Sequence, residues 1–281
     1  MKRIDRIKLD FTRNWKLPGK ERLSNLLRPS DKLKSGIKNG IAWLTGENIA
    51  IYANADSYIE WTILSLGTYE EEINKLIRIS LKDGDNALDI GANIGLQSLR
   101  MSQCVGQSGN VIAFEPLYYL QEKFRRNIIL NRANNVTLLP FALSDIDSED
   151  EFPISTNNWN QGTFSLGSAA TGTEKQHVII KAGDNISEIR SFKSIALIKI
   201  DVEGFEYKVL LGLKHTIERH KPHVIFEYDE NYWINNGQNI GDCYQFLQSL
   251  GYTFYQVTSV GCELITSVQQ IEGGNLFCIP S

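Results

Sequence analysis

The stretch Asn86-Ala87-Leu88-Asp89-Ile90-Gly91-Ala92-Asn93-Ile94-Gly95 decides the fold of this 281-residue chain. A short apolar run ends in Asp89, and two glycines follow before Leu96, where a helix is expected to begin. Gly91 has no Cβ and lets the backbone approach a ligand closely, while Gly95 lets the helix begin close to its strand. The stretch therefore predicts a strand, a nucleotide-cofactor turn and a helix.

A second apolar run, Val111-Ile112-Ala113-Phe114, ends in Glu115-Pro116 about 20 residues further on. An acid at the carboxyl end of a strand can accept hydrogen bonds from both hydroxyls of a ribose. The turn reads Asp-x-Gly-x-x-x-Gly, so it lacks the middle glycine that a dinucleotide's pyrophosphate requires. S-adenosyl-L-methionine, which has a ribose but no phosphate, fits this pattern better than a dinucleotide.

Length and composition limit the class of protein. The chain suits one domain with an extension, or two small domains, and its 42% hydrophobic residues are enough for a substantial core. It contains no run of about 18 apolar residues, and residues 1–5 lack the core of a signal peptide, so the expected compartment is the cytoplasm. Its four cysteines form no Cys-x-x-Cys pair, which argues against a structural zinc and a disulfide framework.

Charge is distributed unevenly along the chain. Residues 1–38 contain 12 Lys or Arg and four acids, a net charge of +8, and the remaining residues carry −12. Apolar residues such as Ile4, Ile7 and Phe11 recur at helical spacing among these bases. This basic arm either lies on an anionic membrane surface, at the inner face, or packs on the body or on a second subunit. Because the body is acidic, nucleic acid is not an expected partner.

Strand and helix patterns alternate from residue 86 onward, after an expected hairpin in which residues 41–44 and 49–52 flank a turn. Strands are predicted at 86–90, 110–115, 135–143, 196–202, 223–229, 252–260 and 275–279, and helices at 69–80, 95–104, 117–131, 204–220 and 240–250. This alternation predicts an α/β fold with a mostly parallel, doubly wound sheet, whose ligands bind at the carboxyl ends of the strands.

One predicted segment breaks this alternation. Residues 146–195 form a long connection between two strands, rich in Ser, Thr, Asn and Gly. Long connections inside compact domains are often lids or binding loops. Trp159 and Phe164 could stack on a substrate there, or Trp159 could anchor the loop to the core. Among the histidines, His177 in this segment is the candidate that could reach a substrate.

A further apolar strand, Leu197-Ile198-Lys199-Ile200, leads to Asp201-Val202-Glu203 just before Gly204. With the Asp-x-Gly turn, Glu115-Pro116, Ala142-Leu143-Ser144-Asp145 and Val224-Ile225-Phe226-Glu227, the chain resembles the FkbM family of S-adenosylmethionine-dependent methyltransferases over roughly residues 69–280. The resemblance implies a Rossmann-like class I methyltransferase fold, in which a seven-stranded sheet has helices on both faces and an antiparallel last strand. We therefore predict an arm and small hairpin over residues 1–68 and a methyltransferase domain over 69–281.

The resemblance also implies a cofactor site. Asp89 and Gly91 would lie by the methionine moiety, Glu115 on the ribose, and Phe141 and Ala142 beside the adenine. Asn93 and Gly95 belong to the same turn as Gly91. Many class I methyltransferases place an acid at the Phe141 position to hold the adenine amine. This chain does not, so Asp145 or a backbone carbonyl would have to serve.

Methyl transfer to a hydroxyl requires that water be excluded, that the acceptor oxygen be aligned and that its proton be removed. Asp201 is the first candidate for the base or acceptor-orienting group, and Glu203 and Glu227 are the next. Glu203 or Glu206 could instead cap the helix that begins near Gly204. The same acids could also hold Mg²⁺, although no metal is indicated, and without a histidine in the cluster zinc is not expected.

Family substrates are mostly sugars, glycolipids and polyketide-type metabolites. The leading hypothesis is an O-methyltransferase that acts on a sugar, glycan or glycolipid, because the amide-rich segment 146–195 suits a hydroxylated acceptor. An O-methyltransferase of a polyketide or other secondary metabolite is the alternative. A third hypothesis is a non-catalytic cofactor-binding subunit of a glycan-assembly complex. The sequence also leaves open whether the chain forms a homo-oligomer.

Overall fold

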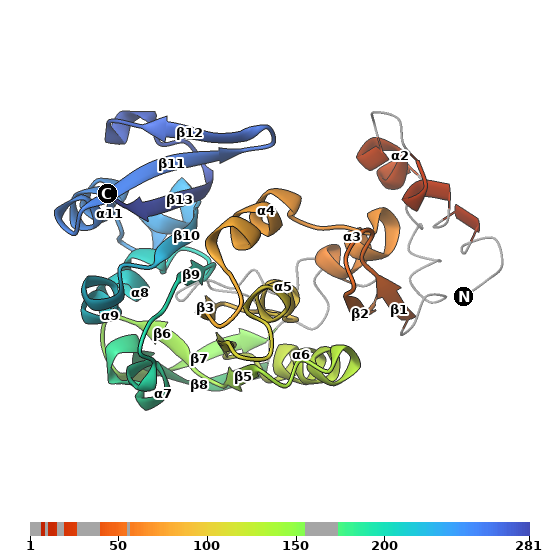
Figure 1. The fold of residues 1–281 in the computed structure, drawn as a ribbon, viewed down its shortest axis with the longest axis horizontal. Helices are drawn as coiled ribbons and strands as arrows, with labels where there is room; N and C mark the ends of the chain where they lie inside the picture. The colour runs from red at the N-terminus through yellow and green to blue at the C-terminus, as the bar shows by residue number, and fades with distance from the viewer. Residues whose placement is uncertain (1–6, 9–10, 16–19, 27–39, 55–56, 155–173) are drawn as a thin grey trace.

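The computed structural model describes residues 7–8, 11–15, 20–26, 40–54, 57–154 and 174–281. A single large sheet runs through its centre (Figure 1). Its strands are β3 (Asn86–Ile90), β4 (Asn110–Phe114), β5 (Val136–Leu139), β9 (Leu197–Ile200), β10 (His223–Tyr228), β11 (Tyr252–Thr258), β12 (Gly261–Ile265) and β13 (Gly274–Pro280). Their spatial order is β12-β11-β13-β10-β9-β3-β4-β5. Strands β5, β4, β3, β9 and β10 pair in parallel, and β13 runs antiparallel to β10 and β11.

The predicted α/β fold class with a mostly parallel sheet is confirmed, and the sheet has eight strands instead of seven. The additional strand, β12, arises because the predicted run 252–260 stops at Thr258 and the chain reverses through two residues to Gly261. The Thr258 hydroxyl donates to the Gly261 carbonyl (3.1 Å) and accepts from its N–H (3.2 Å), which closes the hairpin. β12 therefore extends the sheet by antiparallel pairing with β11.

Two predicted elements are divided in the structure. The predicted strand 135–143 becomes β5 and the separate β6 (Ala142–Ser144), because Pro140 between them has no N–H to donate to a sheet. The predicted helix 204–220 becomes α8 (Glu206–Gly212) and α9 (Lys214–His220). A Cβ on Gly212 would lie 1.9 Å from the carbonyl oxygen of Ser144, so α8 ends where it packs directly on β6.

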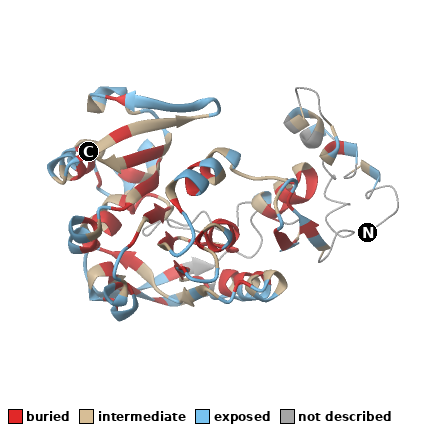
Figure 2. Ribbon diagram, viewed as in Figure 1, coloured by how far each residue is buried: buried red, intermediate tan, exposed pale blue. Residues whose placement is uncertain are grey.

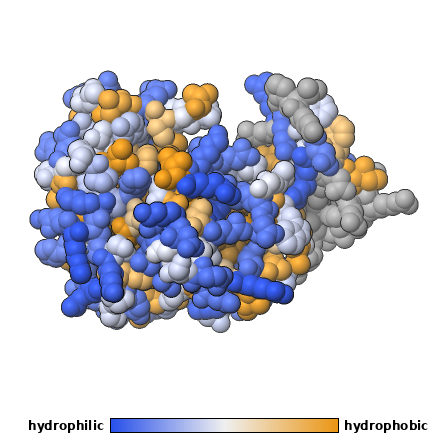
Figure 3. Space-filling view, viewed as in Figure 1, coloured by the Kyte–Doolittle hydropathy of each residue, from blue (hydrophilic) through white to orange (hydrophobic). Residues whose placement is uncertain are grey.

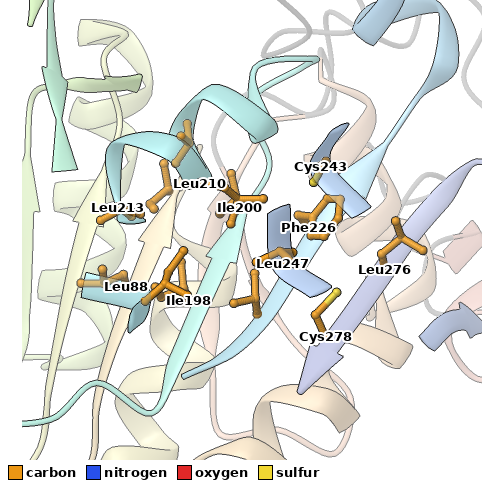
Figure 4. Packing of buried hydrophobic residues seen from close by; sticks show 14 of the residues in the cluster. Leu88, Ile198, Ile200, Leu210, Leu213, Phe226, Cys243, Leu247, Leu276 and Cys278 are labelled. Carbon is orange, nitrogen blue, oxygen red and sulfur yellow. The ribbon is translucent and has the colours of Figure 1, made fainter. Parts of the chain in front are cut away.

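Helices cover both faces of the large sheet (Figure 1). One face carries α4 (Glu71–Ser80), α5 (Leu96–Val105) and α6 (Tyr118–Asn131), and the other carries α7 (Ser187–Ser191), α8, α9, α10 (Glu230–Asn235) and α11 (Ile240–Ser249). Side chains alternate between the two faces along each strand. Leu88, Ile198 and Phe226 point toward the α8 and α11 side (Figure 4). Figure 2 shows the buried residues gathered on these strands and on the inner faces of the helices.

The predicted hairpin is present as β1 (Gly40–Trp43) and β2 (Ala50–Ala53). It is held to the domain by polar contacts: Asn127 and Asn131 of α6 accept hydrogen bonds from the N–H groups of Tyr52 and Ala50, each at 2.8 Å. Glu47 in its turn forms a buried ion pair with Arg100 of α5 (2.7 Å). These contacts cross the boundary predicted between residues 68 and 69.

The described part of the basic arm packs on α3 (Tyr58–Leu66), beside which α2 (Lys20–Leu26) lies in Figure 1. The Thr12 hydroxyl donates to the Ser65 carbonyl (3.0 Å), and the Lys20 ammonium donates to the Leu66 carbonyl (2.8 Å). Among the helices in the described ranges, none has the length and hydropathy that a membrane crossing needs. On the face drawn in Figure 3, hydrophobic side chains lie in small groups among hydrophilic ones. The hydrogen bonds from Thr12 and Lys20 to α3 fit the alternative in which the arm packs on the body.

The long segment after residue 146 contains regular structure. Strands β7 (Ser148–Ile154) and β8 (Glu174–Ala182) pair antiparallel and form a three-stranded sheet with β6, and the 3₁₀ turn Gly183–Asn185 and α7 follow. His177 on β8 is exposed and contacts Glu149 (3.0 Å). The candidate stacking residues Trp159 and Phe164 lie outside the described residues.

We predict that Gly95→Ala destabilises the protein more than Gly237→Ala does. Both glycines have a left-handed φ (86° and 67°), where any Cβ adds strain of about 1–2 kcal/mol. Only the Cβ at Gly95 would also meet a neighbour, since it would lie 2.0 Å from the buried Phe124 ring, and such overpacking costs about 1–3 kcal/mol. Urea unfolding of the two variants measures the difference. Equal losses would show that Phe124 moves aside.

Candidate active site

A cavity of about 390 Å³ lies at the carboxyl ends of β3, β4, β9 and β10. Its wall also includes the start of α3 and the Tyr69-Glu70 pair before α4. Most of the residues that the sequence predicted as site residues line it: Gly91, Asn93, Glu115, Phe141, Ala142, Asp201, Glu203 and Glu227. The fold therefore brings together residues that are up to 136 positions apart in the chain (Gly91 and Glu227).

Three predicted cofactor residues are not in this wall. Asp89 is fully buried, and the Ser98 hydroxyl donates to its Oδ2. Gly95 is the N-cap of α5 and packs against Phe124. Asp145 is exposed and accepts a hydrogen bond from the Ser144 hydroxyl (2.9 Å). The structure thus gives Asp89 and Gly95 places behind the cavity wall and leaves Asp145 at the surface.

Gly91 joins three strand ends. Its N–H donates to the Phe114 carbonyl at the end of β4 (3.0 Å), and the Asp201 N–H beyond β9 donates to the Ile90 carbonyl at the end of β3 (2.9 Å). A Cβ on Gly91 would lie 1.8 Å from the Asp201 carbonyl oxygen. The close approach that requires glycine here is therefore made by the backbone of the protein itself, and Gly91 still faces the cavity.

Glu115 connects the glycine turn to the next helix. One of its carboxylate oxygens accepts from the N–H of Asn93 and the other from the N–H of Leu117, both at 2.8 Å. Burial raises the pKa of Glu115 to about 8, although the two hydrogen bonds oppose this rise. The same carboxylate lines the cavity, where its contact with a ribose stays a prediction.

A buried lysine lies among carboxylates behind this wall. Lys199 on β9 is the neighbour of Asp89 on β3, and its ammonium donates to Oδ2 of Asp201 (2.9 Å). Asp89 Oδ1 has no hydrogen-bond partner among the described residues. Burial alone would lower the pKa of Lys199. The charges of Asp201, Asp89 and Glu70 outweigh burial and raise that pKa above its ordinary value.

The other two predicted catalytic acids have raised pKa values. Burial, and then the nearby Asp201 charge, raises the pKa of Glu203 to about 8. The same two causes raise the pKa of Glu227 well above its ordinary value, and its carboxyl shares a hydrogen bond with Asp201. A hydrogen bond between two carboxyl groups needs one proton, and the raised pKa of Glu227 favours Glu227 as the donor to Asp201.

Sequence reasoning missed several polar residues in the wall or next to it, among them Tyr69, Glu70, Lys199, Asp229 and Tyr232. Lys199 had a signal in the sequence, because a lysine inside an apolar strand must have a buried partner. Glu70 comes to the wall through a left-handed backbone (φ 48°) and accepts from the Gln97 side chain (2.7 Å). Asp229 caps α10 through the Tyr232 N–H (3.0 Å). No local sequence pattern indicated Asp229 and Tyr232, because α10 was not predicted.

The wall suits S-adenosylmethionine in its chemistry. That cofactor carries two positive groups, a sulfonium and an ammonium, together with a flat adenine and a ribose. The cavity offers carboxyl groups for the cations and apolar side chains such as Ile90, Phe114 and Leu143 for the ring. Within the described ranges, no group of three or more His, Cys, Asp or Glu is arranged to hold a metal ion.

Glu206, which lies next to these acids, is expected to make the stability of the fold depend on pH. It is buried, its Oε1 accepts from the N–H groups of Val202 (2.9 Å) and Gly204 (3.2 Å), and its Oε2 has no described partner. Burial raises its pKa to about 7 from 4.5 in the unfolded chain. The proton on Glu206 therefore stabilises the fold fully below pH 4.5, and this stabilisation is lost as the pH rises through 7.

We predict that Glu206→Gln becomes more stable relative to the wild type as the pH is raised from 4.5 to 8, by on the order of 3 kcal/mol, because glutamine has no proton to lose. Urea unfolding at several pH values measures this change. Glu218→Gln, at a surface position of α9, is the matched control and should give a constant difference. A constant difference for Glu206→Gln as well would contradict the prediction.

Comparisons with known proteins agree with this geometry. The family model described as the Methyltransferase FkbM domain matches residues 89–254, more than half of the chain. Methyltransferase 1 of Beauveria bassiana is 25% identical over 185 residues, which cover 59% of this chain and 73% of that protein. Hexuronic acid methyltransferase AglP of Haloferax volcanii is 27% identical over 153 residues, which cover 53% of this chain and 58% of that protein.

A solved structure is also similar. Methyltransferase FkbM from Methylobacillus flagellatus is 16% identical with a TM-score of 0.45, and the match covers 78% of this chain and 53% of that one. The family match begins at Asp89 and ends in β11, so it spans the glycine turn, the Glu115 strand end and the acids of β9 and β10. The chain therefore belongs to the FkbM methyltransferase family and is an S-adenosylmethionine-dependent methyltransferase of the class I fold.

Proposed function

We propose that this enzyme transfers the methyl group to a hydroxyl of a sugar, glycan or glycolipid. The observation that carries the proposal is the convergence of Asp201, Glu203 and Glu227 in the cavity wall, at the carboxyl ends of β9 and β10. An alcohol is a weak nucleophile and must lose its proton as its oxygen reacts, so a nearby carboxylate is what this reaction requires. When bound, the cofactor supplies a methyl group made electrophilic by its positively charged sulfur.

The other tasks fall to the chain itself. Asp201 takes the proton that the acceptor hydroxyl loses, while hydrogen bonds from Lys199 and from protonated Glu227 hold its carboxylate in place. Tyr69 and Tyr232, also in the wall, offer phenol hydroxyls that can orient an acceptor. Apolar wall residues exclude water from the reacting atoms.

The charge of the wall supports an acceptor that is neutral where it reacts. The described lining of the cavity contains no Lys, Arg or His. It contains six acidic residues: Glu70, Glu115, Asp201, Glu203, Glu227 and Asp229. A carboxylate acceptor would need no base and would be repelled by Asp201 and Asp229. The relative AglP is named for a hexuronic acid, which supports a sugar-type acceptor. The acidic wall favours an uncharged sugar over an acidic one.

An acceptor panel tests this proposal. We predict that labelled S-adenosylmethionine methylates the methyl glycoside of glucose or galactose with a kcat/KM at least about tenfold above that of the methyl glycoside of glucuronic acid, because like charges repel in the cavity. The product should be an ether, which survives alkali, whereas a methyl ester is hydrolysed. Methylation that is confined to the uronic acid, or a product that alkali removes, would refute the hydroxyl assignment.

Asp201→Asn tests the proton acceptor. Asparagine keeps the size and one carbonyl oxygen of the side chain but removes the negative charge. Turnover should therefore fall by about 10²-fold or more, while affinity for S-adenosylhomocysteine changes little. Asp150→Asn, on the exposed part of β7, is the matched control and should leave both unchanged. Full turnover in Asp201→Asn would exclude Asp201 and leave Glu203 or Glu227 as the base.

A further inference from the structure

Lys199 is a cation that neither the cavity wall nor solvent explains. Its side chain is 5% exposed, and Lys199 is not among the residues that line the cavity. Burying an ammonium group is costly unless it is paired, and an apolar residue often serves the stability of a core at least as well. Packing alone therefore gives no reason for a lysine at the centre of this apolar strand.

Several elements supply charges that face Lys199. Asp201 follows it on β9 and accepts its hydrogen bond at 2.9 Å. Asp89 pairs with it across β3, and Glu70 faces it from the start of α4. Beyond Asp201 lie further acids on which its charge acts: Glu115, Glu203, Glu206 and Glu227. One ammonium thus lies within a group of seven carboxyl groups, and the one it contacts directly is Asp201.

The Asp201 side chain is 30% exposed and reaches from Lys199 to the cavity. Its carboxyl group lies between the Lys199 ammonium, which donates to it, and the Glu227 carboxyl, with which it shares a hydrogen bond. Without the ammonium, Asp201 would lie among acids alone within the described site: Glu70, Asp89, Glu115, Glu203, Glu206 and Glu227. One more carboxyl group of this cluster would then take up a proton, and the Asp201 side chain would keep only its contact with Glu227.

We propose that Lys199 is a positioning residue, whose ammonium fixes the Asp201 carboxylate through their 2.9 Å ion pair and supplies the positive charge opposite the acids around it. This proposal rests on the function proposed above, because it assigns Asp201 a task in the reaction. Lys199 acts through Asp201 and touches neither acceptor nor reacting atoms. Arginine should replace it, since a guanidinium keeps the positive charge and the N–H donors, whereas methionine removes both and keeps an unbranched side chain of similar length.

Proton release on cofactor binding tests the proposal without any acceptor. S-adenosylmethionine brings positive charge to the acids, so carboxyl groups that hold protons must release some of them. In Lys199→Met one more carboxyl begins protonated, and release should rise by about half a proton or more per cofactor bound. Calorimetric titration of the full chain at pH 7, in two buffers of different ionisation enthalpy, measures this number. Lys199→Arg should match the wild type.

Three further variants separate positioning from folding. Lys214→Met removes a lysine from a surface ion pair on α9 and should leave proton release unchanged. If Lys199→Met folds poorly, Lys199→Met combined with Glu70→Gln restores the balance of buried charge and is compared with Glu70→Gln alone. A structural role predicts equal proton release within that pair, and the positioning role predicts the same increase as before.

The outcomes are distinct. Equal release in wild type and Lys199→Met would overturn the proposal, because the acidic group would then keep its charge without the ammonium. Loss of cofactor binding in Lys199→Met, both alone and combined with Glu70→Gln, would also overturn the proposal, because Lys199 would then belong to the cofactor site. The proton count involves no acceptor, so a failure of hydroxyl methylation in the acceptor panel is read separately from a failure of Lys199 to control Asp201.

Discussion

The contact between the backbones of Gly91 and Asp201 is the constraint on which the site depends. The carbonyl oxygen of Asp201 occupies the place where a Cβ of residue 91 would be, at 1.8 Å. This contact brings the turn after β3 directly against the end of β9, and the Asp201 N–H closes it by donating to Ile90 (2.9 Å). The glycine turn and Asp201 thus form one wall of the cavity, and the distance between them is set by backbone atoms that cannot adjust as side chains do.

Alternation along the strands decides which charges meet in that wall. Leu88, Ile198 and Phe226 point to the α8 and α11 side and form the largest core cluster, whereas the residues beside them point to the α4 and α5 side. Asp89 and Lys199 are register partners on this second face, and Asp201 follows two residues after Lys199. Because a strand repeats every two residues, the sheet presents its charged side chains on the same face at the same edge. Burial then raises the pKa values of Glu115, Glu203 and Glu227, which lets so many acids coexist around one lysine.

The N-terminal residues support the wall of the same cavity. α3 contributes its first residues to the wall, and its last turn is held by Thr12 and Lys20 of the arm. Arg100, which pairs with Glu47 of the hairpin, also donates to the carbonyl of Tyr69 (2.8 Å), a residue of the wall. Polar contacts of the arm and the hairpin therefore reach elements that form part of the cavity wall. The family match begins only at Asp89, so this support for the cavity comes from a part of the chain outside the matched region.

The sequence by itself determined the elements whose pattern is local. Strand β3 has the predicted bounds, and the acids predicted at the carboxyl ends of β4, β9 and β10 line one cavity, because an apolar run, its terminal acid and the following glycine are adjacent in the chain. Only the tertiary structure decided what depends on distant partners. Lys199 is explained by its Asp89 and Glu70 neighbours, Glu70 reaches the wall through a left-handed backbone, and β12 exists through its pairing with β11. Register between strands and the burial of charge are properties of the packed chain, and no short window of residues contains them.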